Sequence, residues 1–327
     1  MDTTTDVAIV GAGPCGLAAA IAMRTAGMGA IVFERASVVS GIVGYPTYMT
    51  FFSTAERLSI GDVPFIIATE KPTRRDALAY YRAVTARYEL NVRQYERVDE
   101  VARDGDGFLL RSVTRGGEVN YTRARSVVIA TGYFGCPNRL NVPGEDLPHV
   151  THRFIEGHEA FERRAVVVGG GNSAVDAALD LYRSGAHATI VHFGPGLDPN
   201  IKPWVLPDIT NRIAEGSIGA RWQARIRAIE PTAIVIESPA GEERLPAEHV
   251  YLMIGYMPEN ALLLQLGVPL DPVTGVPAHD PTTMETSVPG VFIAGVLASG
   301  YNANKTFIEN GRDHGKLIAA HLVKTAA

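Results

Sequence analysis

Two glycine-rich segments of this chain have the residue types and the spacing of dinucleotide-binding loops. The first is Gly11-Ala12-Gly13-Pro14-Cys15-Gly16, and the second is Gly169-Gly170-Gly171-Asn172-Ser173-Ala174. In the G-x-G-x-x-G/A pattern, the first glycine permits a tight turn and the second lets the backbone approach a pyrophosphate. The third small residue lets the helix pack on its strand, and the helix N-terminus favours the phosphate charge. A chain that binds two dinucleotides most often passes a hydride from one to the other.

The residue that should meet the adenosine ribose differs between the two loops. Gly11 and Glu34 are 23 positions apart, as are Gly169 and His192. The Glu34 carboxylate suits a ribose diol and repels a 2′-phosphate, so the first site is predicted to take the adenosine of FAD or NAD. At the second site, His192 can donate to a phosphate and Lys202 follows it, which favours NADPH. The alternative is that His192 is only a polar residue at a strand end.

The elements that must position these loops follow an α/β pattern. Strands are predicted at residues 7–10, 30–34, 126–132, 165–168, 188–193, 249–254 and 291–295, and helices at 17–25, 74–88, 174–184 and 306–324. Shorter strands are predicted at 92–101, 107–114, 118–123, 224–229 and 233–237. The last strand and helix cannot bury a core alone, so they should return to the first domain.

The predicted fold is therefore α/β, with two Rossmann-like dinucleotide-binding domains. An FAD domain is expected at residues 1–150 and 255–327. An NAD(P)H domain, residues 151–254, is expected to be inserted into it.

Composition narrows the class of protein. The chain has 327 residues, a net charge of −5 and no basic tract, so a nucleic-acid partner is not expected. No apolar run has the length of a membrane helix, and no basic segment precedes the first strand, so a cytoplasmic protein without membrane contact is expected. Only two cysteines occur, Cys15 and Cys136, without a C-x-x-C pair or metal-ligand spacing. No metal site is predicted.

Several longer stretches resemble the bacillithiol disulfide reductase family, a branch of the thioredoxin-reductase-like flavoproteins. They are residues 13–16, 45–47, 50–53, 60–63, 204–209 and 307–311. The resemblance implies FAD in the first domain, NADPH in the second, and reduction of a low-molecular-weight thiol disulfide. It also implies a homo-oligomer and a bacilliredoxin-like protein as a partner. Two positions depart from the relatives: Phe193 replaces a basic residue, and Val296 stands where many members of the wider superfamily have an acid.

The motifs and the resemblance together predict the cofactor-binding residues. They are Gly11, Gly13, Pro14, Cys15, Gly16, Glu34, Arg35, Tyr45, Thr50, Phe51, Val98, Ala130, Thr131, Gly132, Gly169, Gly171, Asn172, Ser173, Ala174, His192, Lys202, Gly255, Gly295, Val296, Asn304 and Thr306.

Cys15 is the predicted catalytic residue, because the resemblance marks it as the thiol that matters. Its place at a helix N-terminus should lower its pKa, and a thiolate there can attack a disulfide. The alternative is a small residue that only fits beneath the pyrophosphate. Cys136 is expected to be incidental. Glu309 and His314 are either acid–base residues or part of a solvated helix face.

Other functions share these loops. A ferredoxin or flavodoxin NADP reductase on the same scaffold needs no C-x-x-C and works without Cys15. A flavin monooxygenase has both loops, but its linker histidine is absent at position 148, where Pro148 stands. A flavin-binding sensor without turnover is a fourth possibility, and the intact glycines in both loops argue against it.

Overall fold

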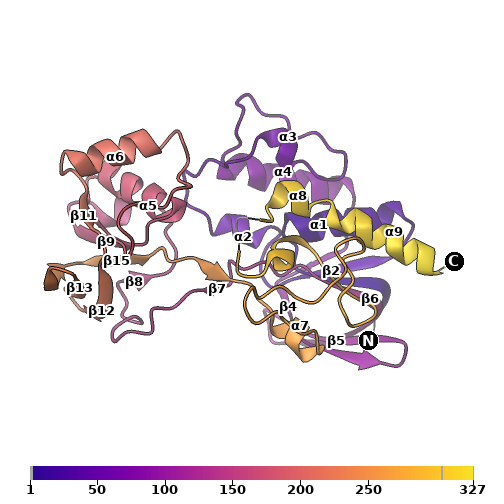
Figure 1. Cartoon of the computed structure of the whole chain (residues 1–327). Coiled ribbons are helices and arrows are strands. Elements are labelled where there is room, and N and C mark those ends of the chain that lie inside the picture. Colours follow the sequence, from indigo (N-terminus) through magenta and orange to yellow (C-terminus); the bar gives the residue numbers. More distant parts are fainter. Residues whose placement is uncertain (1–2, 303–304, 327) are drawn as a thin grey trace. The chain divides into compact units, whose positions relative to one another are not determined.

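The computed structural model describes residues 3–302 and 305–326, and the chain divides into two units (Figure 1). The first unit comprises Met1–Val43, Ser53–Cys136 and Met257–Ala327, and the second comprises Gly44–Phe52 and Pro137–Tyr256. The chain passes between the units four times, and two of these crossings, β7 (Cys136–Pro137) and β16 (Tyr256–Met257), form a two-stranded sheet. These crossings differ from the predicted boundaries, and the segment 44–52 groups with the second unit.

The first unit is built on a seven-stranded sheet in the order β3-β2-β1-β6-β5-β4, with β17 also paired to β6. Its strands are β1 (Thr3–Val10), β2 (Ala30–Glu34), β3 (Val92–Gln94), β4 (Glu96–Asp104), β5 (Gly107–Thr114), β6 (Val119–Ile129) and β17 (Val291–Ile293). β1 is parallel to β2 and β6, whereas β5 is antiparallel to β4 and β6. β17 is parallel to β6, which confirms that the C-terminal strand completes the first sheet.

Two helices from opposite ends of the chain pack together in this unit. Its helices are α1 (Pro14–Thr25), α2 (Ser40–Val43), α3 (Ala55–Leu58), α4 (Arg74–Arg87), α7 (Ala261–Gln265), α8 (Ile308–Gly311) and α9 (His314–Ala326). α1 lies beside α9 (Figure 1). The approach is close, because a Cβ on Gly315 would fall 2.5 Å from the Cα of Ala19. Small residues on both helices therefore hold the C-terminal helix against the loop-bearing one.

Two predicted elements of this unit are interrupted in the structure. The helix predicted over residues 306–324 is two helices, α8 and α9, and between them the Arg312 side chain donates to the carbonyl oxygens of Glu56 and Ser59 at 2.9 and 2.6 Å. The strand predicted over residues 92–101 breaks at Tyr95, which has φ +57°. β3 then extends the sheet beside β2, while β4 pairs with β5.

The second unit has a five-stranded sheet in the order β11-β10-β9-β15-β8 and a three-stranded sheet in the order β12-β13-β14. The strands are β8 (Val150–Thr151), β9 (Arg164–Val168), β10 (His187–Val191), β11 (Gly219–Arg221), β12 (Arg225–Glu230), β13 (Ala233–Ser238), β14 (Gly241–Pro246) and β15 (His249–Leu252). Its helices are α5 (Asn172–Arg183) and α6 (Leu206–Ala214). The parallel strands β9, β10 and β15 confirm the second Rossmann-like unit. β14 is not predicted from the sequence.

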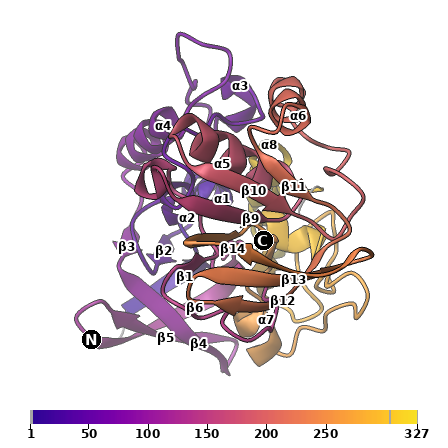
Figure 2. The same ribbon diagram turned by 90° about the vertical axis from the view of Figure 1, so that its left-hand side faces the viewer.

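Both faces of the five-stranded sheet are covered (Figure 2). Ala165 and Val167 of β9 face the core formed with α5, whereas Val166 and Val168 face the core formed with β12–β14. For this reason, the sequence of a buried parallel strand is a continuous run of apolar residues. Within residues 3–302 and 305–326, no helix is both long enough and apolar enough to cross a membrane.

A capping box begins α4. The Thr73 side chain accepts from the Asp76 amide, and the Asp76 carboxylate accepts from the Thr73 amide at 2.9 Å. The Thr73 hydroxyl also donates to the Asp76 carboxylate at 2.7 Å, and this bond, together with the one from the Thr73 amide, lowers the pKa of Asp76. Stabilisation by this carboxylate is therefore present above its ordinary pKa and is lost as the pH falls through the lowered one.

We expect Thr73→Ala to lower the free energy of opening of α4 by about 1 kcal/mol, because the helix loses a capping hydroxyl. Native-state hydrogen exchange of the α4 amides measures this change. Thr73→Ser keeps the hydroxyl and serves as the control. Equal loss in both variants would show that the hydroxyl does not cap the helix.

Candidate functional site

The first glycine loop lies between the ends of β1 and β6. Gly11 has φ +110°, and a Cβ there would fall 2.4 Å from the carbonyl oxygen of Ala130. A Cβ on Gly16 would fall 2.0 Å from the carbonyl oxygen of Gly11. Gly13 differs, because no atom lies within 4 Å of the position of its Cβ. The first and third glycines are required by packing, whereas the second faces open space, as a phosphate-binding position must.

Glu34 ties this loop to the end of β2. Its side chain is buried at 6% exposure. One carboxylate oxygen accepts the Ala12 amide at 3.0 Å, and the other accepts the Ala36 amide and the Ser40 hydroxyl, each at 3.0 Å. A carboxylate has about four lone-pair sites, so capacity remains for a ribose hydroxyl. Glu34 thus has a structural role that the sequence does not reveal.

The residues after β6 are held by the C-terminal part of the same unit. The Thr131 hydroxyl donates to the Glu259 carbonyl at 3.0 Å, and the Glu259 amide donates to the Gly132 carbonyl at 3.1 Å. Arg35 forms an ion pair with the Glu259 carboxylate at 3.0 Å. Val98 is buried on β4. The charge of Arg35 is therefore compensated within the protein.

The C-terminal segment places several predicted residues around Gly295. The Gly295 amide donates to Nδ1 of His314 at 3.1 Å. Burial, assisted by the nearby His279, lowers the pKa of His314, so its ring is neutral and able to accept at neutral pH. Thr306 exchanges a short hydrogen bond with Ser299, and Val296 is partly exposed. Asn304 lies outside the described residues. Glu309 forms an ion pair with Arg57 at 3.6 Å.

The sulfur of Cys15 is packed against backbone. A Cβ on Gly311 would fall 2.9 Å from Sγ, and one on Gly295 would fall 3.1 Å from it. Desolvation by burial raises the pKa of Cys15 to about 12. The expectation that the helix N-terminus lowers this pKa is therefore wrong, because the loss of solvation outweighs the helix dipole. The catalytic role of Cys15 stays a prediction.

The second loop repeats the geometry of the first, except that an acidic side chain lies beside its second glycine. Gly169 has φ +138°, and a Cβ there would fall 2.4 Å from the carbonyl oxygen of Met253. Ala174 occupies the third position and is buried. A Cβ on Gly171 would fall 3.1 Å from Oδ2 of Asp198. Ser173 is exposed at the start of α5, where a phosphate would meet it.

Asn172 and Lys202 organise the segment beside this loop. The Asn172 side chain donates to the Asn200 carbonyl at 2.9 Å and accepts the Lys202 amide at 2.8 Å. The Lys202 ammonium is buried and lies 2.6 Å from the Asp176 carboxylate. Lys202 therefore holds its own segment in place, and its charge is already compensated.

His192 is turned towards the second loop. The side chain is 6% exposed, and Cβ atoms on Gly170 and Gly194 would fall 2.7 and 2.6 Å from its ring. Its Nε2 lies 3.5 Å from Asp198 Oδ1. The next side chain, Phe193, is exposed, and the Arg225 guanidinium lies 5.3 Å from its ring centroid. Sequence reasoning missed Arg225, because it is brought to this strand end by β12.

Three of the predicted cofactor-binding residues, Tyr45, Thr50 and Phe51, lie in the segment 44–52 of the second unit. The rings of Tyr45 and Phe51 are 5.8 Å apart, and Phe52 lies 5.5 Å from Trp204. Thr50, the remaining predicted residue, is partly exposed. The predicted Gly255, also in this unit, has φ +86° and accepts the Asn138 amide at 3.0 Å.

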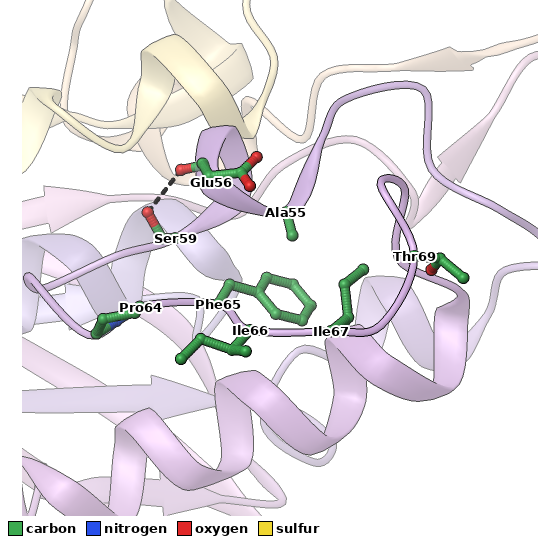
Figure 3. A pocket seen from close by; sticks show the side chains of 8 residues that line it. All are labelled: Ala55, Glu56, Ser59, Pro64, Phe65, Ile66, Ile67 and Thr69. Atoms are coloured by element: carbon green, nitrogen blue, oxygen red, sulfur yellow. Dashed lines mark hydrogen bonds between the residues drawn. The ribbon is translucent and has the colours of Figure 1, made fainter.

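A cavity of about 260 Å³ lies beside α3 in the first unit (Figure 3). Its lining is both apolar and polar and comprises Ala55, Glu56, Ser59, Pro64, Phe65, Ile66, Ile67 and Thr69. The Ser59 hydroxyl donates to the Glu56 carbonyl at 2.6 Å, and Phe65 stacks on Tyr80 at 4.1 Å. The lining holds no nucleophile paired with a base. In residues 3–302 and 305–326, no group of three or more His, Cys, Asp or Glu side chains is arranged to hold a metal ion.

The three glycines of the first loop should respond differently to alanine. We expect Gly16→Ala to lower the melting temperature of the apoprotein strongly, because its Cβ would overlap the Gly11 carbonyl. Gly13→Ala should leave that temperature almost unchanged and weaken FAD binding, because its Cβ would enter only the open space. Thermal melting of the apoprotein and flavin titration separate the two effects. A strongly destabilised Gly13→Ala protein would contradict this assignment.

The raised pKa of Cys15 predicts slow alkylation. At pH 8 the thiolate fraction should be about a thousandfold below that of a thiol with the ordinary value, because each pKa unit is a factor of ten. Iodoacetamide labelling of the apoprotein, followed by peptide mass spectrometry between pH 7 and 10, measures the rate at each cysteine. Fast labelling of Cys15 at pH 7 in folded protein would show that the sulfur is accessible and ionised.

Comparison with known proteins agrees with this arrangement. Residues 8–295 match the family described as pyridine nucleotide-disulphide oxidoreductase. The chain is 45% identical to the bacilliredoxin reductase Bdr of Bacillus subtilis (strain 168), over 97% of each chain. The structure of the bacillithiol disulfide reductase Bdr (YpdA) from Bacillus cereus superposes with a TM-score of 0.97 and 43% identity, covering 99% of this chain and 100% of that one. The corresponding Staphylococcus aureus protein gives a TM-score of 0.95 and 38% identity over the same shares.

These likenesses extend over nearly the whole chain and include both glycine loops. The chain therefore belongs to the pyridine nucleotide-disulphide oxidoreductase family, and it is an NAD(P)H-dependent flavoprotein reductase whose cofactors are FAD and NADPH.

Proposed function

We propose that this chain reduces bacillithiol disulfide, the disulfide of a low-molecular-weight thiol, at the expense of NADPH. The observation that carries the proposal is the extent of its identity with the Bdr reductases. In the overall reaction, one disulfide, one NADPH and one proton give two thiols and NADP⁺. The S–S bond breaks and takes up two electrons and two protons.

The residues of the first loop fit FAD. Open space in front of Gly13 leaves room for a pyrophosphate. α1 begins without a side-chain cap, and Pro14 has no amide hydrogen, so the amides of Cys15 and Gly16 are the donors at this helix start. Glu34 would accept from the ribose. When bound, FAD supplies the two-electron exchange between nicotinamide and disulfide.

The second loop would hold the NADPH pyrophosphate. α5 also begins without a side-chain cap, so the amides of Asn172 and Ser173 are the donors at this helix start, whereas the Ala174 amide donates to the Gly171 carbonyl. Gly171 allows close approach of the backbone, and the exposed Ser173 can add a hydroxyl.

The same proposal includes a partner protein and a cellular compartment. Both Cys15 and Cys136 are free thiols, as a protein of the reducing cytoplasm should have. The likeness to a bacilliredoxin reductase supports a bacilliredoxin-like protein as the partner. A homo-oligomer is also proposed, on the resemblance alone.

Anaerobic oxidation of NADPH by the FAD-loaded protein, with and without bacillithiol disulfide, tests the proposal. We expect turnover that depends on the disulfide. If Cys15 is the catalytic thiol, Cys15→Ala should abolish this turnover while flavin content stays normal. Turnover that survives in Cys15→Ala would leave Cys15 a packing residue beneath Gly295 and Gly311.

Cys136→Ala is the matched control, because it removes the other free thiol of the chain. It should keep wild-type turnover. If the disulfide adds nothing to NADPH oxidation in the wild type, but ferredoxin or flavodoxin accepts electrons, the protein is an electron-carrier reductase instead.

A further inference from the structure

The ribose end of the second loop carries a cation that the sequence does not reveal. β10 ends at Val191, and His192 and Phe193 follow. In dinucleotide-binding folds this strand end meets the adenosine ribose, where an acid selects a 2′-hydroxyl and an arginine accommodates a 2′-phosphate. Phe193 has neither group. Its ring is 64% exposed, however, and the Arg225 guanidinium lies 5.3 Å from its centroid.

Backbone hydrogen bonds fix Arg225 at this place. The Ala224 amide donates to the His192 carbonyl at 3.0 Å, and the Gln223 amide donates to the Gly194 carbonyl at 2.8 Å. These bonds hold the start of β12 alongside the end of β10. The guanidinium is thus positioned by the backbone at one end and by the Phe193 ring at the other.

The other cations close to this strand end are already paired. Lys202 lies 2.6 Å from Asp176, and Arg221 makes two hydrogen bonds to Glu243, both of 2.8 Å. In residues 3–302 and 305–326, Arg225 has no carboxylate within ion-pair distance. It is therefore the guanidinium at this strand end that keeps its donors for a ligand.

His192 does not take this role. Its ring is buried against Gly170 and Gly194, and its Nε2 faces the Asp198 carboxylate. The acidic residue at this strand end is Asp198, and its carboxylate contacts the side of the His192 ring that faces the glycine loop. The exposed side of the strand end is left to Phe193 and Arg225.

We propose that Arg225, held on the Phe193 ring, recognises the adenosine 2′-phosphate of NADPH and makes the site prefer NADPH to NADH. A planar guanidinium can stack on an aromatic face while its outer N–H groups bind a phosphate in bidentate fashion. Arg225 thereby replaces, from another strand, the basic residue that is absent at position 193. The inference rests on the use of NADPH at the second loop.

Calorimetric titration of the FAD-loaded protein with 2′,5′-ADP and with 5′-AMP tests this inference. The bound FAD keeps the first loop occupied, and no disulfide is needed, so failure of the disulfide reaction leaves the result unaffected. We expect Arg225→Gln to weaken the binding of 2′,5′-ADP about tenfold to a hundredfold, because one charge-assisted contact is lost. The affinity for 5′-AMP should stay unchanged.

Arg244→Gln is the matched control, since Arg244 lies in the same three-stranded sheet, is exposed and pairs with Glu230. It should leave both affinities unchanged. Phe193→Arg combined with Arg225→Gln should restore the preference for 2′,5′-ADP. Equal weakening of both ligands by Arg225→Gln, the same loss in Arg244→Gln, or a wild type that does not distinguish the ligands would overturn the inference.

Discussion

One steric constraint, the seating of a glycine against a carbonyl of the neighbouring strand, underlies both units. A Cβ on Gly11 would lie 2.4 Å from the Ala130 oxygen, and one on Gly169 would lie 2.4 Å from the Met253 oxygen. Both glycines also have positive φ, so no other residue fits without strain. Because of this close approach, each loop turns tightly at the carboxyl end of an interior strand, β1 or β9, and leads directly into its helix, α1 or α5. The phosphate sites exist only where this packing is complete.

The strand–loop–helix units could be predicted because each is formed by contiguous residues. The return of β17 to the first sheet could also be predicted. Other features depend on contacts between distant segments. Where the predicted strand breaks, the Tyr95 amide donates to the Ala36 carbonyl, and between the two helices that replace one predicted helix, the Arg312 side chain donates to the carbonyls of Glu56 and Ser59. At the site, Lys202 was predicted to meet a phosphate, but Asp176 compensates its charge. Spacing along the chain carries no information about such partners.

Cys15 shows how two physical effects compete at one position. A helix N-terminus stabilises a thiolate only while the sulfur keeps its solvation or faces the amides. Here the sulfur packs on Gly295 and Gly311, so burial determines the pKa. The sequence shows the helix start but not the two glycines, which come from the far end of the chain.

β6 is the strand at which the beginning and the end of the chain meet, since it pairs with β1, β5 and β17. The second unit ends at Tyr256, before β17 begins at Val291. During synthesis, every residue of the second unit therefore leaves the ribosome before the last strand of the first. The unit that starts the chain is the last to be completed, because its sheet lacks β17 and residues 127–129 of β6 have no strand beside them on that side until the C-terminal segment emerges.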